Sequence, residues 1–98
     1  MLINKFEDLI AWQKAKDLTF LIYRVFKNNK DYSFNNQIQR ASVSVMNNIA
    51  EGFERRTNKE LINFLYIAKG SCGEVRSMLL LALDLGYIAE TDFKICTI

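Results

Sequence analysis

Residues Gln37 to Phe53 read QIQRASVSVMNNIAEGF, and this stretch decides the fold. Apolar or small residues recur in it at steps of three and four, which is the spacing of one helix face; they are Ile38, Ala41, Val45, Ile49 and Gly52. A polar stripe runs beside that face at the same spacing and consists of Arg40, Ser44, Asn48 and Glu51. We therefore predict a helix whose polar stripe either meets polar partners on neighbouring helices or faces a partner molecule.

Motifs in this helix and on both sides of it resemble a known family. The residues that carry the resemblance are Gln37, Arg40-Ala41, Ser44-Val45 and Asn48 to Phe53, preceded by Phe6 to Leu9 and Trp12 to Ala15, and followed by Phe64-Leu65, Ile67-Ala68, Gly70-Ser71 and Leu85 to Tyr87. Together they are similar to the four-helix-bundle proteins found in intervening sequences of bacterial 23S ribosomal RNA genes. The resemblance implies a small helical bundle and a homo-oligomer, often a ring-shaped pentamer. A distantly similar group, the accessory variability proteins of retroelements, adds RNA or a ribonucleoprotein as an implied partner.

The composition fits one helical domain over residues 1–98. Half of the 98 residues are hydrophobic, there is no proline, and the formal net charge is only +2. A dedicated nucleic-acid binder usually carries a larger basic excess. Cys72 and Cys96 have no disulfide-framework spacing, and we expect reduced, buried thiols. Neither a targeting segment nor a membrane-spanning run is visible, so we expect a cytoplasmic protein without a membrane partner.

Periodicity and end signals predict an all-α, up-down antiparallel bundle of four-helix type with its fourth helix truncated to a stub. The expected helices cover residues 8–26, 36–52 and 58–85, with the stub at 90–98. Asn35 is the predicted cap of the second helix and Gly52 its predicted end. Thr57 and Glu60 have the form of a reciprocal capping box before the third helix, which Gly86 is expected to end.

Two further expectations concern packing. Gly70 and Gly73 lie inside the third helix, where each costs about 1 kcal/mol relative to alanine, so we expect a close helix crossing there against Ala41 and Ser42. The short fourth helix leaves apolar faces open, and we expect a neighbouring subunit to cover them. Met46 stands where the resembled family commonly has proline, so the second helix is expected to run straighter.

Catalytic chemistry is hard to build from this sequence. The chain has no histidine, which removes the commonest general base and metal ligand. Glu51 and Glu74 are interpreted as structural carboxylates that pair with Arg40 or Lys69, or that accept hydrogen bonds from hydroxyls and amides. The candidate polar network between helices or subunits consists of Arg40, Ser44, Asn48, Glu51 and Glu74. We expect no enzyme activity, catalytic residue, metal, cofactor or small-molecule substrate.

One basic cluster remains as a candidate contact for RNA phosphate. Arg55, Arg56 and Lys59 lie at the turn between the second and third helices, where exposed helical amides also favour anions. Glu54 and Glu60 weaken the positive field, although a ring would repeat the cluster and add its contacts. Two functions therefore stay open: a non-catalytic oligomeric module that binds RNA or a ribonucleoprotein, and a self-assembling or protein-binding module without a nucleic-acid role.

Overall fold

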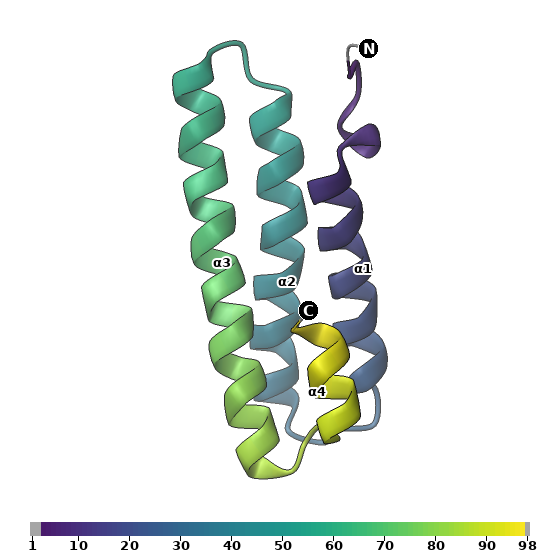
Figure 1. Ribbon diagram of the computed structural model, residues 1–98. Helices are drawn as coiled ribbons and strands as arrows, with labels where there is room; N and C mark the ends of the chain where they lie inside the picture. The colour runs from purple at the N-terminus through teal and green to yellow at the C-terminus, as the bar shows by residue number, and fades with distance from the viewer. Residues whose placement is uncertain (1–2, 98) are drawn as a thin grey trace.

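The computed structural model describes residues 3–97 and confirms the all-α bundle. A 3-10 turn, η1 (Phe6–Asp8), precedes four α-helices: α1 (Ile10–Val25), α2 (Tyr32–Phe53), α3 (Asn58–Leu85) and α4 (Glu90–Cys96). The first three run antiparallel to their neighbours in sequence, and α4 turns back beside the lower ends of α1 and α3 (Figure 1). α2 is continuous through Met46, and most contacts in the bundle are those of α2 with α3 and with α1.

The predicted start of α2 was wrong. α2 begins at Tyr32, and its cap is Asp31, whose carboxylate accepts a hydrogen bond from the Phe34 amide at 3.1 Å. Asn35 is instead buried within the first turns of the helix. Its Nδ2 donates to the Asn29 carbonyl at 2.7 Å, and its Oδ1 accepts from Asn29 Nδ2 at 2.9 Å. Asn35 thus ties the α1–α2 loop to α2 rather than capping the helix.

The first helix also begins later than the predicted residue 8. Leu9 has extended backbone angles (φ −73°, ψ 125°), which separate the 3-10 turn at Phe6–Asp8 from α1. This break lets the ring of Phe6 fold back onto Trp12, with ring centroids 5.2 Å apart in an edge-on arrangement. Trp12 is therefore a packing residue of the upper part of the bundle.

The bounds of α3 agree with the prediction, but only one half of the predicted reciprocal capping box is present among the described residues. Thr57 Oγ1 accepts from the Glu60 amide at 3.2 Å, while no return bond from the Glu60 carboxylate is present among the described residues. Gly86 has φ +73°, and the Tyr87 amide donates to the Ala82 carbonyl at 2.8 Å, closing a Schellman-type end. A left-handed φ of this kind is the conformation that favours glycine.

The glycines inside the helices have different roles from those predicted. Gly52 does not end α2, which continues to Phe53. It is the close-approach residue, because a Cβ there would lie 3.0 Å from Phe64 Cβ and 3.1 Å from Leu61 Cδ1. Gly70 and Gly73 are exposed, and a Cβ on either would meet nothing within 4 Å. The expected close crossing of α3 over α2 therefore occurs at Gly52 instead.

The core has two unequal parts. The larger part fills the lower half, next to α4; its buried members are Ile22, Phe26, Phe34, Ile38, Ala41, Val75, Leu79, Ala82 and Ile88. The smaller part lies in the upper half and consists of Ala15, Val45, Ile49 and Ala68. α4 does not reach this upper half (Figure 1). The part of the bundle with three helices thus has fewer and smaller buried side chains.

Candidate functional site

The centre of the polar stripe forms a hydrogen-bonded link between α2 and α3. Ser44 Oγ and Ser71 Oγ lie 2.9 Å apart. Asn48 Nδ2 donates to Ser44 Oγ at 3.0 Å and to the Ser44 carbonyl at 2.8 Å. All three side chains are partly buried, so these bonds are shielded from water on one side. Ser71 was missed as a polar partner, although its spacing from Ala68 and Val75 places it on the buried face of α3.

The charged members of the proposed network lie apart from this link. Arg40 is exposed at the edge of a shallow hollow of about 440 Å³ that also includes Tyr23, Ser44 and Asn48. Glu51 is exposed and bonds Arg55 on the next turn at 2.7 Å. It thus pairs with neither Arg40 nor Lys69. Glu74 is exposed on α3. Within one chain, the structure brings together Ser44 and Asn48 but not Arg40, Glu51 and Glu74.

Of the three cationic side chains at the turn between α2 and α3, Arg55 contacts other side chains, whereas Arg56 and Lys59 do not form ion pairs with the described residues. Arg55 bonds Glu51, and its guanidinium carbon lies 4.8 Å from the centroid of the Phe64 ring, a cation–π distance. Arg56 and Lys59 are exposed, and the residues that the structure describes offer neither of them an ion-pair partner. Both lie at the amino end of α3, where the helix dipole favours anions. The available charge is thus Arg56 and Lys59.

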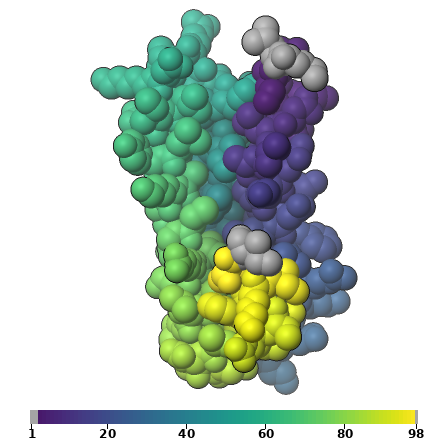
Figure 2. Space-filling view, viewed as in Figure 1, coloured from purple at the N-terminus to yellow at the C-terminus, as the bar shows by residue number. Residues whose placement is uncertain are grey.

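An open groove runs between α1 and α3 beyond the end of α4, with α2 as its floor (Figure 2). Two adjoining hollows of about 520 and 480 Å³ share Leu18, Cys72 and Cys96. Val45 and Ile49 contribute the apolar floor. The sequence predicted open apolar faces but not which residues line this groove. Helical periodicity does not show how far a short fourth helix covers its neighbours.

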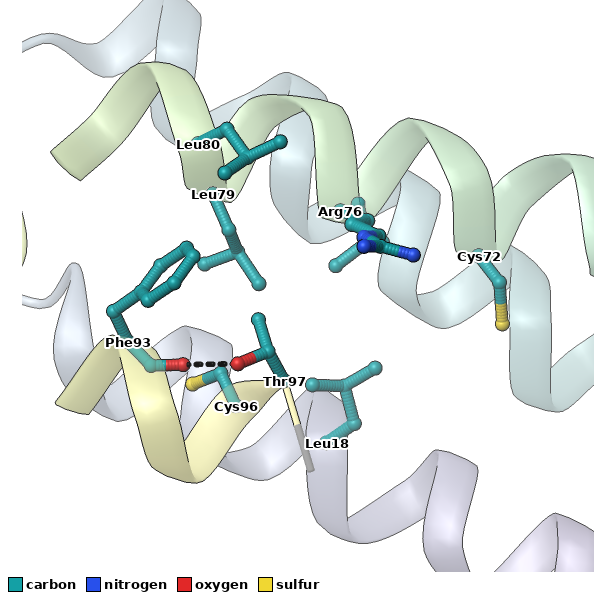
Figure 3. A pocket seen from close by; sticks show the side chains of 9 residues that line it. Leu18, Cys72, Arg76, Leu79, Leu80, Phe93, Cys96 and Thr97 are labelled. Atoms are coloured by element: carbon teal, nitrogen blue, oxygen red, sulfur yellow. Dashed lines mark hydrogen bonds between the residues drawn. The ribbon is translucent and has the colours of Figure 1, made fainter. Parts of the chain in front are cut away.

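Figure 3 shows Cys72 and Arg76 on α3 at one wall of the groove, with the Cys72 thiol directed into it, and Cys96 at the end of α4 with Thr97 beyond it at the other wall. Both thiols are free, and Cys72 is exposed rather than buried as predicted. Although Cys72 is exposed by its surface area, the groove walls partly desolvate its thiol and raise its pKa, and desolvation followed by the Asp92 charge raises the pKa of Cys96. Because the thiolate is the reactive form, neither side chain is an activated nucleophile.

The described residues 3–97 contain no cluster of three or more histidine, cysteine, aspartate or glutamate side chains that could hold a metal ion. Their helices are also too short or too polar to cross a membrane. The features that the described residues do form are an apolar groove, a polar link between α2 and α3, and an exposed basic turn.

Comparisons with known proteins agree with this architecture. The family model described as 23S rRNA-intervening sequence protein matches residues 7–97. A solved structure from Bacteroides thetaiotaomicron VPI-5482, described as a protein of unknown function from the S23 ribosomal protein family, superposes with a TM-score of 0.84. The two chains are 23% identical, and the alignment covers 89% of this chain and 84% of the other. No curated protein matches the chain.

Proposed function

Because the chain belongs to the 23S rRNA-intervening sequence protein family, we propose that it is a non-catalytic helical module that assembles with protein through its apolar surfaces and contacts RNA through the α2–α3 turn. The observation that carries the RNA contact is the pair of exposed cations, Arg56 and Lys59, at the amino end of α3. Phosphate oxygens accept hydrogen bonds from such side chains and from helix N-termini.

Arg55 supports this proposal indirectly. Its bond to Glu51 and its position over Phe64 anchor the last turn of α2 to the first turns of α3. These contacts favour the observed conformation of the turn, from which the two free cations are exposed. A favoured conformation reduces the conformational entropy that a phosphate contact must offset.

Assembly supplies what a single turn lacks. One or two phosphate contacts give weak binding, but several copies of the turn acting on one RNA would add their contacts. The apolar groove between α1 and α3 and the exposed hydrophobic side chains of α3 favour contact with protein. We propose a homo-oligomer on this ground; the pentamer is what the family resemblance implies.

A second candidate function is assembly without nucleic acid. The near balance of charge favours it, because the chain carries only two more cations than anions. Glu54 and Glu60 also lie beside Arg56 and Lys59, and weaken the field at the turn.

The two functions can be separated by removing one arginine at each end of the bundle. We expect Arg56→Gln to reduce the slope of log affinity against log salt for a fluorescein-labelled single-stranded RNA by about 0.7 per lost contact. Arg24→Gln is the matched control, because it removes the same charge from the last turn of α1, at the other end of the bundle. Equal slopes for the two variants would show that Arg56 at the α2–α3 turn does not contact RNA phosphate. If the wild-type protein does not bind the RNA even at low salt, only the second candidate function, assembly without nucleic acid, is left.

A further inference from the structure

The shallow hollow beside Arg40 has a lining that is mostly polar. Its volume of about 440 Å³ falls within the range of about 300–1,000 Å³ that is usual for small-molecule sites. It is lined by Tyr23 of α1 and by Arg40, Val43, Ser44, Asn47 and Asn48 of α2. The apolar groove between α1 and α3 lies on another side of α2, since its floor consists of Val45 and Ile49 from the buried face of that helix. The hollow is therefore a separate concavity.

Two side chains of the hollow have the properties that bind a nucleotide. Tyr23 is 47% exposed, so part of its ring is accessible to a base. Every base can stack on a tyrosine, because every base has a π-face. Arg40 is exposed and forms no ion pair with the described residues, so its guanidinium is available to a phosphate. The hollow thus combines a stacking surface with a cation.

Two carboxamides add hydrogen-bonding capacity beside them. Asn47 is exposed and lines the hollow. Asn48 Nδ2 donates to Ser44, which leaves Asn48 Oδ1 available as an acceptor. Donors and acceptors of this kind match the edges of unpaired bases. The lining therefore offers polar contacts to the base in addition to stacking.

No carboxylate is found among the described residues that line the hollow, and Arg40 is the charged side chain there. Glu51, the carboxylate of α2, bonds Arg55 at 2.7 Å. Asp17, the carboxylate of α1, lies in the apolar groove. Glu74 on α3 is exposed and forms no ion pair with Arg40. The hollow is thus cationic although the net charge of the chain is only +2.

We propose that this hollow binds one unpaired nucleotide of RNA, with its base on the Tyr23 ring and its phosphate at Arg40. The class of ligand rests on the proposed function, but the residues differ from those of the α2–α3 turn. Because the hollow is shallow, a strand can continue on both sides of the bound nucleotide. Its polar lining also separates it from the apolar surfaces proposed for contact with protein. Several copies in an oligomer would add their contacts along one strand.

The first experiment tests stacking with two probes, adenosine and adenosine 5′-monophosphate. Ligand-observed NMR titrations suit an assembly of any size, and we expect saturable binding of both probes to the wild-type protein. Tyr23→Leu should weaken both about fivefold or more, whereas Tyr23→Phe keeps the ring and should stay within about twofold. Tyr66→Leu is the matched control, because it removes an exposed tyrosine from α3 and should change neither affinity. Absence of saturable binding, or a Tyr23→Leu protein with wild-type affinity, would overturn the proposal.

The second experiment tests the phosphate contact. Arg40→Gln should weaken binding of the monophosphate about threefold at low salt and leave adenosine binding unchanged, because only the monophosphate carries the charge that Arg40 contacts. Arg56→Gln is the matched control and should change neither affinity. Both arginines are exposed, so circular dichroism should show that the variants keep their helices. Equal losses for the two probes in Arg40→Gln would contradict the placement of the phosphate.

This inference and the proposed turn contact can fail separately. If Arg56→Gln reduces the salt slope for RNA but neither nucleotide probe binds at the hollow, the inference alone is wrong. If Tyr23→Leu abolishes nucleotide binding while Arg56→Gln and Arg24→Gln give equal slopes, the turn contact alone is wrong. Arg24 does not line the hollow, and its guanidinium carbon lies 5.7 Å from the centroid of the Phe20 ring, so it remains a control for both sites.

Discussion

The hydroxyl oxygens of Ser44 on α2 and Ser71 on α3 lie 2.9 Å apart, which gives these helices a side-chain hydrogen bond between them. Asn48 Nδ2 donates to Ser44 Oγ at 3.0 Å, so the Ser44 hydroxyl is free to donate to Ser71. This link lies in the upper half of the bundle, beside the smaller part of the core. It therefore adds directional bonding to the region with the least apolar burial.

Removing one hydroxyl should weaken the bundle by the net value of that bond. We expect Ser71→Ala to lower the free energy of unfolding by about 0.5–1.5 kcal/mol in urea titrations, since Ser44 loses a partner in a partly buried position. Ser77→Ala on the exposed face of α3 is the control, with a change within about 0.5 kcal/mol. Equal losses for the two variants would show that the Ser44–Ser71 bond adds no stability.

Adding a methyl group should have opposite effects at two glycines. Gly52→Ala brings a Cβ to 3.0 Å from Phe64 Cβ, and we expect a loss of about 1–3 kcal/mol from overpacking. Gly70→Ala meets open space, and we expect a gain of up to about 1 kcal/mol from helix propensity. Urea titrations measure both values. A stabilised Gly52→Ala protein would contradict the close approach of α2 and α3.

The hydrogen bond between Tyr87 and Asp31 should make stability fall at alkaline pH. Tyr87 Oη donates to Asp31 Oδ2 at 2.8 Å, and this bond, followed by burial and the Asp31 charge, raises the pKa of Tyr87. A raised folded-state pKa stabilises the protein below the ordinary tyrosine pKa of about 10, and the contribution is lost as pH rises through the folded value.

The measurement for this prediction is the difference in melting temperature between wild type and Tyr87→Phe from pH 8 to 11. We expect the difference to shrink as pH rises, because the variant has no phenol to ionise. Tyr32→Phe, at an exposed position, should show no such trend. A difference that is independent of pH would show that the hydrogen bond does not favour the protonated phenol.

Local signals in the sequence predicted the ends of α3 well. Thr57 and Gly86 act through atoms within a few residues of themselves, so residue type is enough to identify them. The prediction of where α2 begins was wrong because aspartate and asparagine are both favoured N-cap residues, so Asp31 and Asn35 were both suitable candidates. The choice between them depends on Asn29, which holds Asn35 through hydrogen bonds across six residues, a longer span than the capping pattern covers.

The candidate site was harder to predict for a geometric reason. Helical spacing shows that Arg40, Ser44, Asn48 and Glu51 share a stripe, but it does not show which part of the stripe faces a neighbouring helix. Only its centre meets α3, through Ser71, while Arg40 and Glu51 are exposed. Arg55 likewise has one partner on its own helix, Glu51 four residues earlier, and a second, Phe64, on another helix that spacing along α2 does not show.

The central claim, that the α2–α3 turn contacts RNA phosphate, is tested most directly by the salt dependence of wild-type binding. Affinity for a labelled single-stranded RNA should be measured at a series of salt concentrations. The account predicts binding at low salt whose logarithm falls linearly with the logarithm of salt concentration, and a shallower line for Arg56→Gln. An affinity independent of salt, or no binding at the lowest salt concentration, would contradict it.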